Sequence, residues 1–302
     1  MLRIKVLIDP LETSLFVVFK VKRMKNILSI DLESWVHFYG DALGIKRSRF
    51  SSSERKSIDN HYIPDVTNQI LNLLDEYNQK ATFFIIGELY DWYPSTIEDI
   101  ESRGHEIGYH TQTHRLLRNK EILEEELKKS NAFLRRFNPA GFRAPEIFIT
   151  RDSFACLKKY GFKYSSSSYS GHGITNIDGI DEIPVSAFCF KENDVSDQHL
   201  PKNLTIKMLF KQIPFGSGIF ISLFGSKISY FIDSLNMKGV PAILFFHPWQ
   251  LYTHKQITKP SFRLKLLGCN PLCLPYTINI KKAIEKLFNR HSFLSFRGYY
   301  EY

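Results

Sequence analysis

Two histidines four residues apart, His110 and His114 in the segment HTQTH, are the first candidates for chemistry in this 302-residue chain. This spacing brings both imidazoles to one face of a helix or a turn, within reach of a single metal ion. Such a pair also occurs in purely structural positions. A catalytic metal site needs a third ligand, an oxygen atom, and an open fourth position.

Two carboxylates in the segment Asp31-Leu-Glu33 supply candidates for that third ligand. Residues two apart on a regular strand share a face, so both carboxylates can enter the same site. One could bind the metal ion while the other acts as a general base toward a water molecule. The alternative is that both are simply exposed acids at the end of a strand.

An arginine and a histidine complete the set of candidates. Arg143 precedes Ala-Pro, and an inward-facing guanidinium needs a carboxylate partner, for which Asp31 is the natural choice. That pairing would keep Asp31 ionised and oriented. His247 ends the apolar run AILFF and precedes Pro-Trp. It is either a hydrogen-bonded core histidine or a general acid for a leaving group.

These residues lie where predicted strands end. Short apolar strands alternate with helical patterns, which indicates a parallel sheet covered by helices, as a barrel or a doubly wound sheet. The carboxyl ends of barrel strands carry the active site in such folds. No phosphate-binding glycine motif follows a strand. The expected strands are 27–32, 81–87, 105–110, 141–145, 162–168, 182–188 and 241–247, and the expected helices are 65–79, 94–103, 120–137, 151–160 and 226–238.

The segment 40–60 interrupts this alternation and reads as a polar loop. A loop of that length in a compact domain is usually a lid, a binding loop or a disordered segment.

The net charge of +9 is concentrated at the two ends of the chain. Residues 1–23 carry a net charge of +3 and residues 255–302 a net charge of +7, so the body between them is close to neutral. This distribution predicts a basic surface patch and argues against a nucleic-acid-binding domain. Peripheral contact of the basic C-terminal segment with an anionic membrane is compatible with it.

Residues 1–23 are expected to add little to the core, because the pattern of a soluble α/β domain starts at Met24. No stretch of 18 apolar residues is present, and the run LFVVF is too short for a signal peptide. The four scattered cysteines favour reduced thiols. We therefore expect a cytoplasmic protein, and membrane association through the basic C-terminal segment stays open.

Six motifs, in order and spacing, resemble the polysaccharide deacetylases of the NodB-homology, carbohydrate esterase 4 type: IDLES, TFFIIG, GHEIGYHTQTH, GFRAPE, EIPV and FFHPW. The His-Pro-Trp ending is similar to the subgroup linked to exopolysaccharide and exosortase loci. The resemblance covers about residues 27–252. It implies a distorted (β/α)7 barrel over residues 24–254, followed by a short basic helical extension over 255–302 that packs on the barrel.

The resemblance also implies metal-dependent removal of an N-acetyl group from an amino sugar in a polysaccharide or glycolipid. Glu33, His110 and His114 would hold a divalent ion, Zn²⁺ first and Co²⁺ or another ion second. Asp31 would be the base and His247 the acid.

Further roles follow from the same resemblance. Arg143 would orient Asp31, and the backbone N–H of Glu146, after Pro145, would help to bind the oxyanion. Trp249 would lie beside the substrate. Glu182 matches the acid that lies behind the catalytic histidine, so it would hold His247 protonated.

The sequence departs from the family at three places. It has Asp-x-Glu where adjacent aspartates are common, Ser165 in place of an acid, and a carboxylate at Glu146. Two other functions therefore stay open: a hydrolase of small cyclic amides or ureides on the same scaffold, and a non-catalytic glycan-binding protein.

Overall fold

The structure is a computed structural model that describes residues 24–39, 49–171, 173–190, 209–269 and 271–301. It also describes two short strands, β1 (Lys5–Val6) and β2 (Val17–Val18), which pair antiparallel. The expectation for residues 1–23 falls mainly outside the described residues. Among the described helices, none combines the length and the apolar character needed to cross a bilayer.

Seven parallel strands form the centre of the molecule. Their order is β14-β3-β4-β5-β6-β7-β10, with the short β9 (Thr175–Ile177) antiparallel at the edge. The bounds are β3 (Lys25–Leu32), β4 (Thr82–Ile85), β5 (Glu106–Tyr109), β6 (Gly141–Phe142), β7 (Tyr164–Ser165), β10 (Ile180–Glu182) and β14 (Ile243–Phe246). The predicted parallel α/β fold is confirmed.

The barrel closes irregularly between β10 and β14. The short β11 (Val185–Ser186) pairs with β8 (Tyr169–Ser170), and the Ser186 side chain accepts a hydrogen bond from the N–H of Ile243 on β14. The N–H of Gly216 donates to the carbonyl of Ser186, and the Gly216 carbonyl accepts from Phe245. A Cβ on Gly216 would lie 2.3 Å from the Ile243 carbonyl oxygen, so only glycine fits this seam. These contacts give the distorted (β/α)7 barrel. A separate hairpin pairs β12 (Phe188–Cys189) with β13 (Gln212–Ile213).

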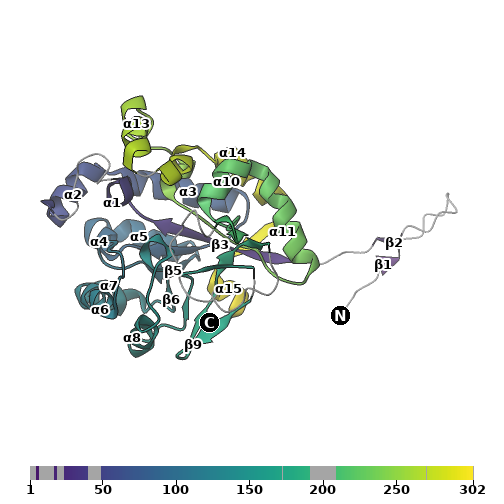
Figure 1. Cartoon of the computed structure of the whole chain (residues 1–302), viewed down its shortest axis with the longest axis horizontal. Helices are drawn as coiled ribbons and strands as arrows, with labels where there is room; N and C mark the ends of the chain where they lie inside the picture. The colour runs from purple at the N-terminus through teal and green to yellow at the C-terminus, as the bar shows by residue number, and fades with distance from the viewer. Residues whose placement is uncertain are drawn as a thin grey trace.

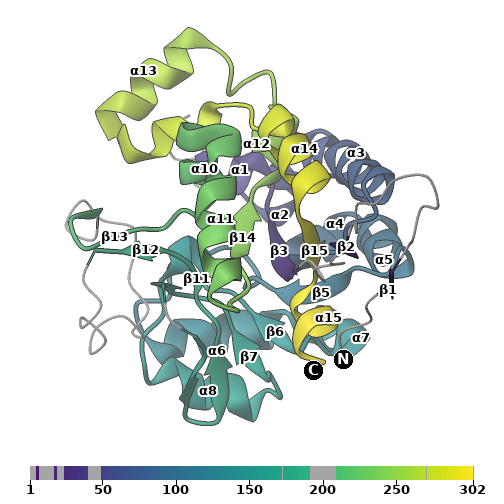
Figure 2. The ribbon, with the colours of Figure 1, turned by 90° about the vertical axis from the view of Figure 1, so that its right-hand side faces the viewer.

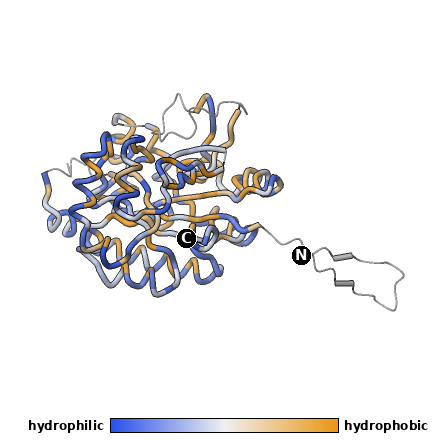
Figure 3. Tube along the Cα trace, turned by 90° about the horizontal axis from the view of Figure 1, so that it is seen from below, coloured by the Kyte–Doolittle hydropathy of each residue, from blue (hydrophilic) through white to orange (hydrophobic). Residues whose placement is uncertain are grey.

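Helices surround the sheet (Figure 1). Hydrophilic and hydrophobic residues alternate along the Cα trace (Figure 3), as in amphipathic helices. Within the described residues, the helices before β14 are α1 (Trp35–Tyr39), α2 (Ser52–Asp59), α3 (Tyr62–Glu76), α4 (Gly87–Trp92), α5 (Pro94–Ser102), α6 (Lys120–Lys129), α7 (Asn131–Phe137), η3 (Pro145–Ile147), α8 (Ser153–Lys159), α10 (Gly218–Phe224), η4 (Gly225–Lys227) and α11 (Ile228–Met237).

Several predicted elements differ in the structure. The expected strand 182–188 is divided, because Glu182 ends β10 and the residues after it form the separate short strands β11 and β12. The expected helix 120–137 is broken at Ser130, whose hydroxyl bonds the side chains of Gln112 and Tyr109. The interpretation of 40–60 as a loop is wrong for its second half, which is the helix α2. Ser51 and Glu54 form a capping box at its start, a local signal that the sequence contains.

The C-terminal segment is part of the barrel. It contains α12 (Pro248–Leu251), α13 (Pro260–Cys269), η5 (Pro271–Thr277), α14 (Lys281–Arg290), β15 (Ser292–Leu294) and α15 (Phe296–Tyr300). The strand β15 pairs parallel with the start of β3, so the extension adds a strand to the central sheet. In Figure 2, α13 lies at the upper edge of the molecule and α15 lies in its lower half. The boundary at residue 254 stays a prediction.

Candidate active site

The predicted metal ligands come together at the carboxyl ends of β3 and β5. Glu33 follows β3, and His110 and His114 lie on the turn after β5. The Nε2 atoms of both histidines lie 3.1 Å from Glu33 Oε1. All three side chains are buried. His110 is fixed in orientation because its Nδ1 bonds the carbonyl of Arg143 at 2.7 Å.

This arrangement fits a divalent metal ion. One ligand atom from each of the three residues lies within 4.8 Å of the other two. Ligands at ~2.1 Å from a tetrahedral ion are ~3.4 Å apart, so these separations need only a small adjustment. Glu33 Oε2 is buried and has no hydrogen-bond partner among the described residues, and a ligand role would satisfy such an atom. Two imidazoles and a carboxylate are the donor set of many zinc hydrolases.

The electrostatics of the ligand cluster follow from its burial. Burial alone would raise the pKa of Glu33, but the imidazoles of His114, His110 and His247 hold it well below its usual range. Burial would lower the pKa of His110, yet Glu33 and Asp31 raise it. The cluster therefore holds its carboxylate ionised, which is the form that binds a cation.

Asp31 and Arg143 form the predicted ion pair. The Nη1 atom of Arg143 lies 2.7 Å from Asp31 Oδ1 and also donates to the Ser29 hydroxyl. The remaining donors of Arg143 reach the carbonyl and the hydroxyl of Ser166. The rings of Phe84 and Phe245 lie within 5 Å of the guanidinium carbon. This complete set of contacts fixes the direction of the Asp31 carboxylate.

His247 follows β14, which neighbours β3 on the side opposite β4 and β5. Its Nε2 lies 3.5 Å from Glu33 Oε1. Its ring stacks on the buried Trp249 at 4.6 Å between centroids, and Tyr276 contacts it edge-on. Trp249 thus supports the histidine ring. Sequence reasoning missed Gln250, whose Oε1 lies 3.4 Å from His247 Nδ1 and accepts the His247 backbone N–H.

A second grouping of possible ligands overlaps the first. Asp31, Glu33 and His247 also offer atoms within 4.8 Å of one another. Arg143 already engages one oxygen of Asp31, and a bound cation would have to share that carboxylate with the guanidinium. We therefore favour the set of Glu33 with the two histidines of the turn.

Pro145 and Glu146 lie in the short helix η3, which begins two residues after Arg143, and Arg143 itself directly follows β6. Pro145 is buried and Glu146 is exposed. Glu146 has a φ of 57°, a left-handed conformation that is uncommon for residues other than glycine. The chain therefore bends sharply here, where the oxyanion-binding N–H is expected.

Glu182 is buried at the end of β10 among serines of the run 165–168. Its Oε1 accepts from the N–H of Ser167 and from the hydroxyl of Ser168. No hydrogen bond or ion pair within the described residues joins Glu182 to His247. Burial raises the pKa of Glu182 to about 7. No contact in the described residues therefore supports the expectation that Glu182 holds His247 protonated.

Replacing Glu182 with glutamine should change the pH dependence of stability. Folded and unfolded chains both hold the proton below pH 4.5, the ordinary pKa of a glutamate carboxyl. As the pH rises, the unfolded chain releases it first, so the wild type loses stability until the pH passes about 7. The difference between the two pKa values corresponds to a loss of at most roughly 3 kcal/mol in the free energy of unfolding.

Thermal unfolding of the wild type and of Glu182→Gln, at a pH near 5 and a pH near 8, measures this effect. The melting temperature of the variant, relative to that of the wild type, should be higher near pH 8 than near pH 5. Glu76→Gln, at an exposed position of α3, is the control and should show no such gain. An equal difference at both pH values would show that Glu182 does not bind its proton in this range.

Part of the chain is similar to known carbohydrate deacetylases. Residues 57–165 match the family model described as polysaccharide deacetylase. A peptidoglycan-N-acetylglucosamine deacetylase of Bacillus cereus is 34% identical over 104 residues, 33% of this chain and 49% of that protein. A chitooligosaccharide deacetylase of Bradyrhizobium sp. strain ANU 289 is 31% identical over 129 residues, 41% of this chain and 56% of that protein. The chain thus spans about half the length of these curated relatives.

The fold has a relative among solved structures. A Mycobacterium smegmatis protein, which its own description places among the polysaccharide deacetylases, superposes with a TM-score of 0.54. The superposition covers 89% of this chain and 86% of that one at 16% identity, so it supports the fold alone. The matched family model and the named relatives agree with the resemblance found in the motifs: residues 57–165 of this chain match the model of the polysaccharide deacetylase family.

Proposed function

We propose that this protein hydrolyses the N-acetyl group of an N-acetylated amino sugar in a glycan or glycolipid and requires a divalent metal, Zn²⁺ in the first place. One observation carries the proposal. The buried ligand set of Glu33, His110 and His114 lies beside a carboxylate, Asp31, that Arg143 orients, and beside an imidazole, His247, from the strand on the other side of β3. A ligand set, a base and an acid are the parts that amide hydrolysis needs.

Each residue has a distinct task in this proposal. Asp31 accepts the proton of the attacking water through the carboxylate oxygen that Arg143 leaves available. His247 donates a proton to the amide nitrogen as the C–N bond breaks, so that the sugar leaves as an amine. The N–H of Glu146 donates to the developing oxyanion.

A divalent ion held by Glu33, His110 and His114 would supply Lewis acidity, polarising the amide carbonyl and lowering the pKa of a water molecule. The chain contributes the geometry. Arg143 makes four hydrogen bonds, one of them to Asp31, and these hold the guanidinium and therefore the carboxylate in place. Trp249 fixes the plane of the His247 ring. Both tasks are matters of preorganisation, because a displaced base or acid loses its effect on the transition state.

The substrate class rests on the relatives. Those matched above are named for peptidoglycan N-acetylglucosamine and for chitooligosaccharide, which share N-acetylated glucosamine. We propose the same chemical group for this chain. Peripheral contact of residues 255–302 with an anionic membrane stays a prediction, as does a cytoplasmic location.

Acetate release tests the proposal directly. The purified full chain, first stripped of metal and then loaded with Zn²⁺, is incubated with N-acetylglucosamine oligomers, peptidoglycan fragments, a lipid-linked N-acetylated sugar, and a cyclic ureide. We expect acetate from at least one sugar substrate, only in the loaded protein, and no opening of the ureide. Ring opening without acetate release would instead assign the chain to the cyclic amide hydrolases. Neither product from any substrate would favour a glycan-binding role.

A further inference from the structure

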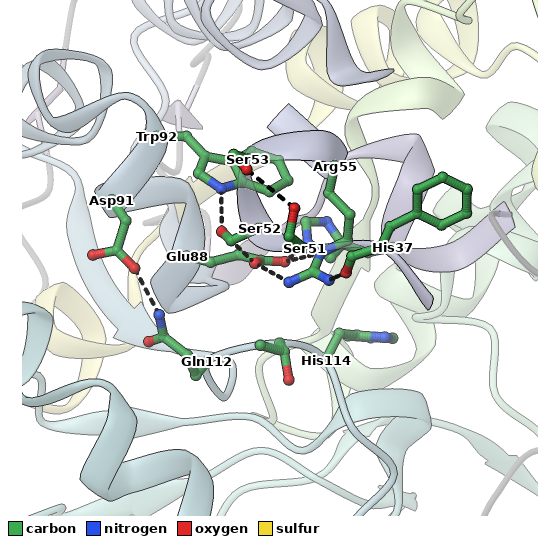
Figure 4. Close-up of polar contacts among 12 residues, drawn as sticks. His37, Ser51, Ser52, Ser53, Arg55, Glu88, Asp91, Trp92, Gln112 and His114 are labelled. Carbon is green, nitrogen blue, oxygen red and sulfur yellow. Dashed lines mark hydrogen bonds and ion pairs between the residues drawn. The ribbon is translucent and has the colours of Figure 1, made fainter. Parts of the chain in front are cut away.

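A buried charged cluster next to the candidate metal site has no place in the mechanism above. The cluster consists of Glu88, His37 and Arg55, which point toward one another in Figure 4. Glu88 lies in the first turn of α4 and is 1% exposed. Arg55 of α2 donates to both carboxylate oxygens of Glu88, at 3.0 and 2.6 Å. No role for these three residues is predicted from the sequence, because they come from three separate segments.

Glu88 connects through His37 to the backbone beside the ligand Glu33. His37 Nε2 lies 2.6 Å from Glu88 Oε1, and His37 Nδ1 lies 3.2 Å from the N–H of Ser34. Since Nδ1 accepts the backbone proton, Nε2 carries the hydrogen that is donated to Glu88. The ring therefore forms a rigid bridge from Glu88 to the peptide unit that directly follows Glu33.

The charge state of Glu88 supports this bridge. Burial alone would raise the pKa of the carboxyl, but His37 and Arg55 together lower it to about 2. Ser52 also donates to Glu88 Oε2, and Trp92 donates to the Ser52 hydroxyl. An ionised carboxylate with this many donors is held in a single orientation.

The helix α4 also contacts the turn that carries His110 and His114, which we call the histidine turn. The N–H groups of Gly87 and Glu88 donate to the carbonyls of Thr111 and Gln112, at 2.8 and 3.1 Å. The Gln112 side chain donates to Asp91 at 2.8 Å, a contact drawn in Figure 4. A Cβ on residue 87 would lie 2.2 Å from the Gln112 side-chain oxygen, so glycine permits this close approach.

The histidine turn needs such restraint. Thr111 and His114 adopt φ values of 62° and 58°, in the left-handed region, which is unfavourable for a residue other than glycine. A turn with two such residues keeps its shape only when its surroundings impose it. The buried Glu126 of α6 contributes as well, because it accepts from Thr113.

We propose that the first turn of α4 sets the distance between the two halves of the metal site. Glu88 fixes the backbone beside Glu33 through His37. Gly87 and Asp91 fix the histidine turn through their hydrogen bonds to it. Glu88 and Asp91 are thus positioning residues, and the inference rests on the proposed metal site. Removing a residue that orients a metal ligand typically weakens metal affinity by about 10–100-fold.

Metal affinity tests this inference without reference to activity. Zn²⁺ is titrated into the full chain against a chromogenic chelator, for the wild type, Glu88→Gln, Asp91→Ala and the control Glu101→Gln. Glu101 is an exposed carboxylate of α5 that pairs only with the surface residue Arg136 among the described residues. We expect about a 10–100-fold weaker affinity for Glu88→Gln, a smaller loss for Asp91→Ala, and no change for Glu101→Gln.

A second readout separates positioning from general destabilisation. The visible absorption spectrum of the Co²⁺-loaded protein depends on ligand geometry, so it should shift in Glu88→Gln. A lower melting temperature with unchanged Zn²⁺ affinity and Co²⁺ spectrum would overturn the inference and leave the proposed function intact. A wild type that binds neither ion would overturn the proposed function itself. Should Glu88→Gln fail to fold, Asp91→Ala carries the same test, because Asp91 lies at the surface.

Discussion

Replacing Asp31 with asparagine should lower kcat for acetate release by about 10²–10⁴-fold, the usual contribution of a general base. Asparagine has the same shape and can still accept the hydrogen bond from Arg143, so the fold should persist. It cannot take a proton from water. The measurement is kcat and KM on the sugar substrate that the wild type cleaves best.

Zn²⁺ affinity decides between the two roles that the geometry allows for Asp31. If Asp31 is the base, Asp31→Asn binds Zn²⁺ as the wild type does, whereas His110→Ala loses the metal. If Asp31 is a ligand, as the grouping with Glu33 and His247 permits, the Zn²⁺ affinity of Asp31→Asn drops as well. Asp99→Asn, at an exposed position of α5, is the matched control. Near-normal turnover of Asp31→Asn would refute the proposed mechanism.

Much of the site could be predicted because its residues follow strand ends. A carboxylate or imidazole directly after a buried apolar run marks the carboxyl edge of a parallel sheet, and Asp31, His110 and His247 all lie there. The match to the family model ends at residue 165, so His247 lies outside it. Strand order places it beside Glu33 nevertheless.

The supporting residues could not be predicted, for a physical reason. The polar helix α2 lacks an apolar stripe to mark it, although its capping box is visible in the sequence. Its anchor is the ion pair between Arg55 and Glu88, which lie 33 residues apart, and a local pattern does not contain such a pair. The same holds for β15, whose partner β3 is at the other end of the chain.

Glu182 shows the limit of transferring a role by position. The motif EIPV places an acid where the family has one, and in the structure this residue is buried at the end of β10. Its hydrogen bonds nevertheless go to Ser167 and Ser168, whose neighbour Ser166 holds Arg143. The position was predictable, while the partners depend on the conformation of the serine run.

Replacing His247 with alanine should also lower kcat by about 10²–10⁴-fold on an N-acetylated sugar. The loss should depend on the leaving group, because an amine leaves only after protonation. An aryl acetate releases a weakly basic phenolate that needs no proton. His247→Ala should therefore keep most of the wild-type rate on an aryl acetate, while Asp31→Asn should lose activity on both substrates, since both need an activated water molecule.

This comparison separates acid catalysis from structural support. The His247 ring stacks on Trp249 and contacts Tyr276, so its removal could loosen the site and slow every reaction. His247→Gln fills more of the space and serves as a second variant without an imidazole. If both variants lose equal activity on the sugar and on the aryl acetate, His247 supports the site and is not the acid. If only the sugar reaction is lost and Zn²⁺ affinity is retained, the proton that releases the amine comes from His247.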